Sequence, residues 1–284
     1  MKQHIALSLA TAALLSLGLS GCPSAPPPGT QAWVVPAATA ATDAPAPLPH
    51  RFSLISWNIH KQLGQPQWQQ EFARMQHDYT PDLLALQEVN VDPTIAPELA
   101  PYHYAFGANL QQRDGSQSGV MSLTGSPILS ARLKLTTPAE PITHTPKAAL
   151  LTQVALDEQQ SLMLVNIHGI NFVTSSDYRQ QLDNLEKRIA EHQGPVIFAG
   201  DFNTWSSQRQ KLLTALAGRQ GLKQVQFSDK EKSEIKQFLG QPLDHILYSC
   251  QLTPVADSSR VLSEFTSSDH TPLLVEFEYS PVCG

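Results

Sequence analysis

The chain has 284 residues, of which 41% are hydrophobic and 15% are charged, and its formal net charge is −6. This length and composition allow one large hydrophobic core or two small ones. An acidic chain gains little from releasing counterions on nucleic acid, which argues against tight non-specific DNA binding. It leaves open a phosphate substrate bridged by a metal ion, because the cation supplies the positive charge.

Residues 1–21 have the features of a secretory signal peptide, with a positive start at Lys2 and an apolar segment that is too short to span a bilayer comfortably. The end of this segment, Leu19-Ser20-Gly21-Cys22, resembles the lipobox of bacterial lipoproteins. We therefore expect Cys22 to become the lipidated first residue of a mature chain of charge −7, with an ordinary cleaved signal as the alternative. Pro23 after the cysteine favours the outer membrane, so the expected location is the bacterial cell envelope, facing the periplasm.

Residues 22–50 follow as the lipidated cysteine and a tether. Eight prolines and eight alanines fall between residues 23 and 50, without an apolar period. Such a composition predicts an extended segment with no core of its own. The folded domain is therefore expected over residues 51–284.

The first half of this domain alternates predicted strands and helices. Residues 52–57 form a strand that ends at Asn58, and a helix starting near Pro66 carries the apolar stripe Trp68, Phe72 and Met75. A buried strand over 83–86 ends at Gln87-Glu88. Strands near 102–106, 119–123 and 149–156 have short polar connections, which favours antiparallel pairing.

The second half continues the alternation. A strand over 161–167 ends at His168, and Ser175 or Ser176 is the expected cap of a helix whose inner face carries Tyr178, Leu182, Leu185 and Ile189. A helix with Leu212, Leu213 and Leu216 runs to Gly218, and strands are expected over 222–227, 243–248 and 272–279. The interleaving predicts a layered α/β domain with mixed sheets.

The segment Gly194–Trp205 is the most informative stretch of the sequence. Val196–Ala199 is a continuous apolar run, typical of a strand buried on both faces, and Asp201 and Asn203 follow Gly200. Being two residues apart, the two side chains can leave the strand end on the same side. A carboxylate and an amide there can aim a water and stabilise developing charge, although both residues are also common turn formers.

Polar groups recur at the ends of the predicted buried strands. They are Asn58, Glu88, His168, Asp201 with Asn203, Asp244, and Asp269 with His270. Each has a structural explanation when taken alone, but strand ends are where α/β folds collect their sites. Carboxylate and amide oxygens suit Mg²⁺ or Mn²⁺, and histidines with a carboxylate can move protons. Together they indicate phosphoester hydrolysis.

This set resembles the endonuclease/exonuclease/phosphatase superfamily. The matching blocks are Ser56-Trp57-Asn58-Ile59, Leu86-Gln87-Glu88-Val89, Asn166-Ile167-His168, Gly200-Asp201-Phe202-Asn203, Leu243-Asp244-His245-Ile246 and Ser268-Asp269-His270-Thr271-Pro272. They occur in the family's order over residues 51–279. The resemblance implies a four-layer α/β sandwich, two mixed β-sheets packed between helices, with the site at one pole.

The resemblance also implies a role for each matching residue. Glu88 would be the principal Mg²⁺ (or Mn²⁺) ligand, and Asn58 and Asp269 would complete the metal sphere directly or through water. Asp201 would orient or deprotonate the attacking water, and Asn203 would bind the phosphoryl oxygens. His270, oriented by Asp244, would be a base or a phosphate-stabilising donor, and His168 would contact the phosphate or assist the leaving group. The number of metal ions and the identity of the base stay open.

The expected function is a Mg²⁺-dependent phosphodiesterase, nuclease-like or phospholipid-directed, attached to a membrane through Cys22 and monomeric. The alternative is a catalytically inactive binding module on the same scaffold. A serine hydrolase is disfavoured because the sequence has no Gly-x-Ser-x-Gly elbow. No exposed apolar hairpin is evident. Lys61 and Lys147 are expected to be solvated, with contact to the phosphate as the alternative, and the mixed-charge segment 228–237 is expected to be a solvated face, with a substrate grip as the less favoured alternative. Whether Cys250 pairs with Cys283 is left open.

Overall fold

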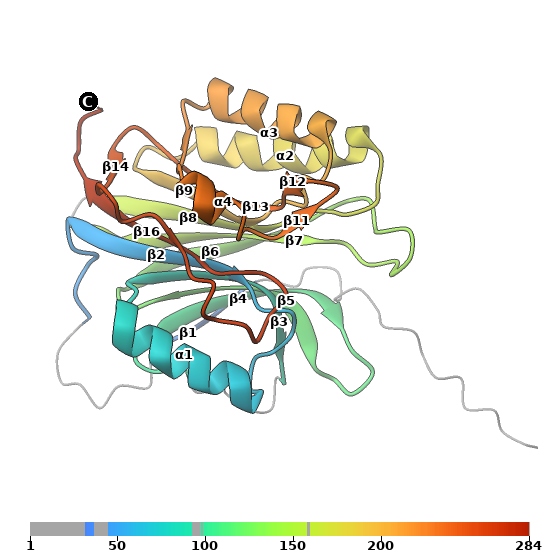
Figure 1. Cartoon of the computed structure of the whole chain (residues 1–284), viewed down its shortest axis with the longest axis horizontal. Helices are drawn as coiled ribbons and strands as arrows, with labels where there is room; N and C mark the ends of the chain where they lie inside the picture. The colour runs from blue at the N-terminus through green and yellow to red at the C-terminus, as the bar shows by residue number, and fades with distance from the viewer. Residues whose placement is uncertain (1–31, 37–44, 93–96, 98, 158–159, 284) are drawn as a thin grey trace, which may run out of the picture.

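The computed structural model describes residues 32–36, 45–92, 97, 99–157 and 160–283. Two β-sheets lie face to face, with one long helix on the outer face of the first sheet and two on the outer face of the second (Figure 1). This is the four-layer α/β arrangement that the sequence predicted, with mixed strand directions in both sheets. The predicted signal peptide and Cys22 lie outside the described residues.

The first sheet has eight strands, of which seven follow the order β1-β4-β5-β3-β2-β16-β14 while β15 pairs with β16. Their bounds are β1 Trp33–Val35, β2 Arg51–Asn58, β3 Leu83–Val91, β4 His103–Gln111, β5 Gln117–Thr124, β14 Leu252–Pro254, β15 Arg260–Val261 and β16 Leu273–Tyr279. β2 and β3 run parallel, whereas the pairings of β4 and β16 are antiparallel. The carboxyl ends of β2 and β3 therefore reach the same edge.

The second sheet has six strands in the order β10-β13-β9-β8-β7-β6. Their bounds are β6 Ile128–Leu135, β7 Ala148–Ala155, β8 Ser161–His168, β9 Val196–Asp201, β10 Lys223–Gln224 and β13 Asp244–Tyr248. β8 and β9 are parallel and bring His168 opposite Asp201, while β13 pairs antiparallel with β9. A separate two-stranded hairpin joins β11 Gln237–Phe238 to β12 Gln241–Pro242.

The helices are α1 Pro66–Tyr79, α2 Ser175–Ala190, α3 Ser207–Arg219 and the short α4 Asp229–Lys232. The N-cap of α2 is Thr174, whose hydroxyl accepts from the backbone of Asp177, so the predicted cap at Ser175 or Ser176 is one or two residues late. Among the residues that the structure describes, no helix combines the length and apolarity of a membrane span.

Apolar side chains fill the spaces between the four layers. Phe52 and Leu54 of the first sheet meet Ile197 and Ala199 of the second in the core between the sheets. The predicted α1 stripe of Trp68, Phe72 and Met75 packs on the outer face of the first sheet. The predicted inner face of α2 and the leucines of α3 pack on the second sheet. These stripes are thus core, as predicted.

A buried polar bridge crosses between the sheets. Asn166 of β8 is fully buried, and its amide nitrogen donates to the carbonyls of Leu86 (3.0 Å) and Met121 (2.8 Å) in the first sheet. The amide nitrogen of Gln87 donates in turn to Asn166 Oδ1 at 2.8 Å. Because buried polar groups are costly without partners, this bridge favours one register between the two sheets.

Several elements differ from the sequence-based expectation. β6 was not predicted because its half-exposed residues give no clear apolar run, and the strand expected over 222–227 is reduced to β10. β14, β15 and the β11–β12 hairpin were also missed. Within the expected tether, β1 pairs with β4, and Leu48 is buried in the core between the sheets. Ordered packing therefore begins before Arg51.

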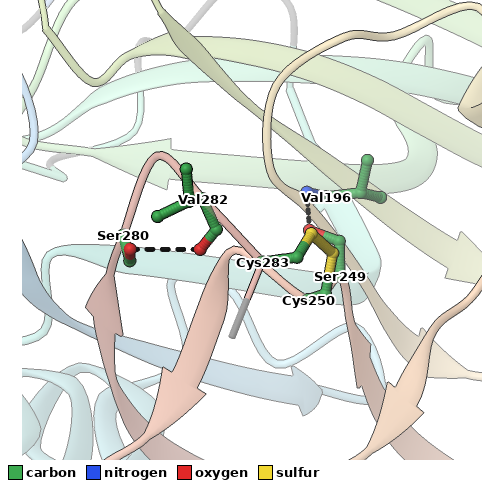
Figure 2. Close-up of a disulfide and its surroundings, with 6 residues drawn as sticks. All are labelled: Val196, Ser249, Cys250, Ser280, Val282 and Cys283. Carbon is green, nitrogen blue, oxygen red and sulfur yellow. Dashed lines mark hydrogen bonds between the residues drawn. A yellow bond between two sulfur atoms is a disulfide. The ribbon is translucent and has the colours of Figure 1, made fainter.

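A disulfide joins Cys250, in the turn after β13, to Cys283 near the end of the chain (Figure 2). The two Cα atoms are 4.9 Å apart. Beside it, the Ser249 hydroxyl accepts from the backbone of Val196 at the start of β9. The pairing that the sequence left open is present, and it fixes the last residues against the second sheet.

Candidate active site

Six of the polar residues predicted at strand ends line one cavity of about 310 Å³. They are Glu88, His168, Asp201, Asn203, Asp269 and His270. The other two predicted site residues, Asn58 and Asp244, stand behind this lining and are hydrogen-bonded to Asp201 and His270. The structure therefore brings all eight together at one pole, where the strand ends of both sheets meet.

Asp201, at the end of β9, lies at the centre of the group and is buried. Its Oδ1 accepts from the backbone N–H of Asn203 at 2.9 Å, and its Oδ2 accepts from Asn58 Nδ2 at 3.1 Å. The Nε2 atoms of His168 and His270 lie 3.7 and 4.0 Å from the same Oδ2. One carboxylate oxygen thus faces an amide and two imidazoles.

Burial and the neighbouring charge of Asp244 raise the pKa of Asp201 to about 7, against the opposing effects of His270, the Asn203 N–H and Asn58. A carboxylate in this range can take up and release a proton near neutral pH, which is the property required of a general base. Desolvated carboxylates with raised pKa values are common at catalytic sites.

His270 is paired with Asp244 through a 2.8 Å contact between Nδ1 and Oδ2. Burial lowers the pKa of His270, but the charge and hydrogen bond of Asp244, with the charges of Asp201 and Asp269, outweigh it and raise the pKa to about 9. At neutral pH the ring is therefore a cation with its Nε2 toward the cavity. Trp57 Nε1 also donates to the carbonyl of His270 at 2.9 Å, which fixes the backbone.

His168, at the end of β8, has the opposite character. Burial, together with the positive charges of Lys147, His270 and Lys61, keeps the pKa of His168 well below its usual range. Its Nε2 is 3.8 Å from Glu88 Oε1, and its carbonyl accepts from Gln181 Nε2 of α2 at 3.2 Å. The site therefore holds one neutral and one cationic imidazole on either side of Asp201.

Glu88 reaches the cavity through an irregularity in β3. The pairing of β3 with β5 shifts register between Leu86 and Val89, and Glu88 adopts a φ of 51°. A bulge re-aims the side chain that it carries, and a non-glycine residue in the left-handed region costs roughly 1–2 kcal/mol. Such strain is characteristic of positions held for a function.

Two glycines allow the strand ends to approach each other. At Gly200, φ is 140° and a Cβ would lie 2.1 Å from the carbonyl oxygen of Ile167. A Cβ at Gly169 would lie 2.3 Å from the carbonyl oxygen of Phe202. Asn203 follows at a φ of 52°, and its Nδ2 donates to the Gly169 carbonyl at 2.9 Å. Any larger residue at these glycines would separate His168 from Asp201.

Arg209 of α3 holds the two loops that carry His168 and Asn203. It is buried, and its guanidinium donates to the carbonyls of Ile170 (2.7 Å) and Asn203 (3.0 Å). The guanidinium lies over the rings of Tyr178 and Trp205, at 4.3 and 4.8 Å from their centroids. The charge is thus stabilised by cation–π contacts where water is excluded.

Asp269 lies on the opposite wall in a charged cluster. Its Oδ2 accepts from Lys236 Nζ at 2.8 Å, and its Oδ1 lies 3.0 Å from His60 Nδ1. Burial raises the pKa of Asp269, but the Lys236 hydrogen bond and the charges of His270, Lys236 and His60 bring it below its ordinary value. One carboxylate oxygen of Asp269 thus pairs with the Lys236 ammonium and the other faces the His60 ring, so neither oxygen is free to bind a metal ion directly.

The oxygen donors of the cavity fit a hard divalent cation only in part. Glu88 presents a carboxylate to the cavity, and Asn58, in the neighbouring parallel strand, has an amide oxygen that accepts from the His60 N–H at 3.0 Å. Such oxygens suit Mg²⁺ or Mn²⁺. Within the described ranges, no group of three or more His, Cys, Asp or Glu side chains is arranged to hold a metal ion. Water would have to supply the remaining ligands.

The sequence-based reasoning missed Arg209 and favoured the wrong alternative for two lysines of this site. Lys236 falls in the segment expected to be a solvated face, with a substrate grip as the alternative, and Lys147 was expected to be solvated, with contact to the phosphate as the alternative; both line the cavity. Lys147 Nζ lies 3.5 Å from the buried Glu140. For Arg209 a signal existed: it continues the Leu213 and Leu216 stripe of α3 toward its start, where a basic residue is unexpected.

Comparison with known proteins agrees with this geometry. The sequence profile of the Endonuclease/Exonuclease/phosphatase family matches residues 55–270. A "UPF0294 protein" of Klebsiella pneumoniae (strain 342) is 36% identical over 255 residues, which cover 88% of this chain and 90% of that protein.

Two solved structures share the fold at low sequence identity. The endonuclease/exonuclease/phosphatase from Beutenbergia cavernae DSM 12333 has a TM-score of 0.62 and 16% identity, and the match covers 81% of this chain and 72% of the other. The 3′ phosphatase NExo from Neisseria, bound to a product DNA hairpin, has a TM-score of 0.56 and 17% identity, with 80% of this chain and 100% of the other covered.

Proposed function

Because the chain belongs to the endonuclease/exonuclease/phosphatase family, whose members hydrolyse phosphoesters, we propose that it is a divalent-metal-dependent phosphodiesterase. The observation that carries the proposal is the environment of Asp201 Oδ2. This oxygen accepts a hydrogen bond from Asn58 Nδ2, and it lies 3.7 Å from Nε2 of the neutral His168 and 4.0 Å from Nε2 of the cationic His270. A base, an anion-stabilising cation and a hydrogen-bond donor for the leaving group are the groups that water attack on phosphorus requires.

In the proposed reaction, Asp201 accepts a proton from the attacking water as the new phosphorus–oxygen bond forms. Protonated His270, oriented by Asp244, donates from Nε2 to a phosphoryl oxygen and offsets the charge that develops there. Neutral His168 donates a hydrogen bond to the departing alkoxide, and the proton that Asp201 took from the water passes to this oxygen, so that the group leaves as an alcohol and Asp201 returns to the carboxylate. The products are a phosphomonoester and an alcohol, and Asn203 supplies a further amide donor to the phosphate.

A bound Mg²⁺ or Mn²⁺ would polarise the phosphoryl group and offset the negative charges of the site. Glu88 would be its principal ligand, with Asn58 beside it. Asp269 would join this set only by exchanging its contacts with Lys236 and His60, so we propose for it a place at the margin of the metal sphere, reached through water.

Hydrolysis of bis-(p-nitrophenyl) phosphate by the full chain tests the proposal. We expect Mg²⁺-dependent turnover that a chelator removes and that Glu88→Ala and His270→Ala each lower by at least about a hundredfold. Glu278→Ala and His77→Ala, at exposed positions away from the cavity, are the matched controls. Turnover that survives the chelator and both site variants would refute the assignment.

Metal binding needs a readout of its own. Mg²⁺ should raise the thermal unfolding temperature of the wild type, and the shift should shrink in Glu88→Ala but persist in Glu278→Ala. Mg²⁺ binding without any turnover would favour the alternative, a binding module on the same scaffold.

The proposed location is the outer membrane, through a lipid on Cys22. The lipobox-like segment supports it, and the Cys250–Cys283 disulfide fits an oxidising compartment. Metabolic labelling with a radioactive fatty acid should mark the wild type and fail to mark Cys22→Ser. Equal labelling of both proteins would contradict this location.

A further inference from the structure

Exposed apolar side chains gather at the mouth of the cavity. Ile142, Phe172, Phe238 and Leu239 have 80, 54, 44 and 72% of their surface exposed. Ile142, Phe172 and Phe238 line the cavity opening, and Leu239 follows Phe238 at the turn of the β11–β12 hairpin. We call these four side chains the apolar rim. The hairpin is the exposed apolar feature that the sequence did not reveal.

The rim is assembled from three segments that are remote in sequence. Ile142 lies between β6 and β7, Phe172 follows β8, and the hairpin precedes β13. The Phe172 ring meets the rings of Phe238 and Trp205, with centroids 6.4 and 6.3 Å away. These contacts hold two of the segments together, and Ile142 of the third segment lines the same cavity.

The backbone at the rim is strained. Phe172 and Leu239 both have positive φ angles, of 51° and 52°. Bulky residues seldom occupy this region, because it is costly without glycine. Retaining a phenylalanine and a leucine there, with both side chains exposed, indicates that their outward presentation is used.

Polarity changes in order from the floor of the cavity to its mouth. Asp201 and the two histidines are buried, Lys147 and Lys236 are partly exposed and are paired with Glu140 and Asp269, and the rim side chains are exposed. This order matches an amphiphile whose anionic phosphodiester enters first and whose hydrocarbon stays outside.

Other partners fit the rim less well. Ile142 and Leu239, the two most exposed side chains of the rim, offer neither ring faces for bases nor hydrogen bonds to sugars. Four side chains are also far fewer than the roughly 20–30 residues that a stable protein interface uses on each side. Exposed aliphatic and aromatic side chains gathered on one surface are the composition that inserts into a lipid surface.

We propose that the apolar rim docks the cavity mouth on a lipid surface and that the substrate is a phospholipid, whose phosphodiester then reaches the cavity. The docking surface stands on the rim itself, whereas the substrate class rests on the proposed phosphodiesterase function.

Vesicle binding tests the docking surface without any need for turnover. The protein is the full chain carrying Cys22→Ser, so that every variant has the same unlipidated N-terminus. Vesicles of phosphatidylethanolamine and phosphatidylglycerol are sedimented, and the bound fraction is measured. We expect Ile142→Ser/Leu239→Ser to lower the partition coefficient at least about tenfold, because two large apolar side chains no longer insert.

The matched control is Leu129→Ser/Val282→Ser. These positions are similarly exposed, at 58 and 71%, but do not line the cavity. We expect the control to bind vesicles as the parent does. Equal binding by the rim variant and the parent, or an equal loss in both variants, would overturn the docking surface.

The second arm measures hydrolysis of the vesicle phospholipid relative to bis-(p-nitrophenyl) phosphate. The rim variant should lower this ratio at least about tenfold, in step with its partition coefficient. Rim-dependent vesicle binding without hydrolysis of either ester would keep the docking surface and refute the proposed function. Hydrolysis of the soluble ester without rim-dependent binding, or of nucleotides in place of the phospholipid, would refute the lipid proposal alone.

Discussion

Replacing Arg209 by methionine removes the cation that joins the two catalytic loops while keeping the length and apolar stem of the side chain. The guanidinium donates to three backbone carbonyls, those of Ile170, Asn203 and Val173. Burial lowers the pKa of Arg209, whereas Tyr178, Glu140 and Asp201 raise it. These three groups therefore stabilise the buried guanidinium cation. The substitution leaves these carbonyls without their donor.

The cost follows from these contacts. Each buried carbonyl that loses its donor costs about 1–3 kcal/mol, and partial relaxation makes the losses less than additive. We expect the free energy of unfolding to fall by roughly 3–5 kcal/mol, as measured by urea denaturation at neutral pH. The loop that follows His168 and the loop that carries Asn203 then lose their common hydrogen-bond donor, so both side chains are held less precisely. We therefore expect kcat on the soluble diester to fall at least about tenfold, a larger factor than the rise in KM.

Arg219 offers a control on the same helix. It pairs with Glu186 at 2.6 Å, but the pair lies at the surface, so Arg219→Met should cost less than about 1 kcal/mol and leave kcat unchanged. Arg209→Lys should recover only part of the loss, because an ammonium cannot span the carbonyls. Equal denaturation midpoints for Arg209→Met and Arg219→Met, with equal kcat, would refute the positioning role.

Three further predictions concern stability. Burial lowers the pKa of His245 to about 4, against the charge of Asp244 and a hydrogen bond with the Pro242 backbone. The stability that neutral His245 contributes is therefore complete above about pH 6.5 and is lost as the pH falls toward 4. Between pH 7 and 5 the free energy of unfolding of the wild type should fall by about 2 kcal/mol more than that of His245→Gln, as measured in denaturant titrations. Asn166→Leu breaks the polar bridge between the sheets and should lower the free energy of unfolding by roughly 2–4 kcal/mol. A double-mutant cycle with Gln87→Leu should show a coupling energy of about 1 kcal/mol, whereas strictly additive losses would mean that the two side chains do not act together. Reduction of the Cys250–Cys283 disulfide, whose cysteines are 33 residues apart in sequence, should lower the free energy of unfolding by roughly 2–4 kcal/mol. An unchanged thermal unfolding midpoint in reductant would show that the crosslink does not restrain the unfolded chain.

Much of the fold follows from local patterns. The apolar runs at 83–86 and 196–199 and the stripes of α1 and α2 predicted buried strands and amphipathic helices, and the structure places them in the core. β6 could not be found in this way, because its burial alternates irregularly along the strand. The same holds for the β11–β12 hairpin, whose strands are only two residues long.

The polar residues of the site were also predictable as candidates, since they follow buried strands in a fixed order. Their pairing was not. Asp269 was expected among the metal ligands, but its contacts with Lys236 and His60 depend on three segments that meet only in the folded chain. The contrast between a cationic His270 and a neutral His168 likewise arises from burial and neighbouring charges, which no sequence window contains.

The amino-acid sequence by itself determined the layered α/β architecture, the family and the list of polar strand ends, because apolar periodicity and motif order are local properties of the chain. The tertiary structure alone decided the bulge that aims Glu88, the buried cation that joins two loops, the disulfide, and the apolar side chains around the cavity. Each of these depends on segments tens to more than a hundred residues apart, and the free energy that selects them exists only once the two sheets have packed.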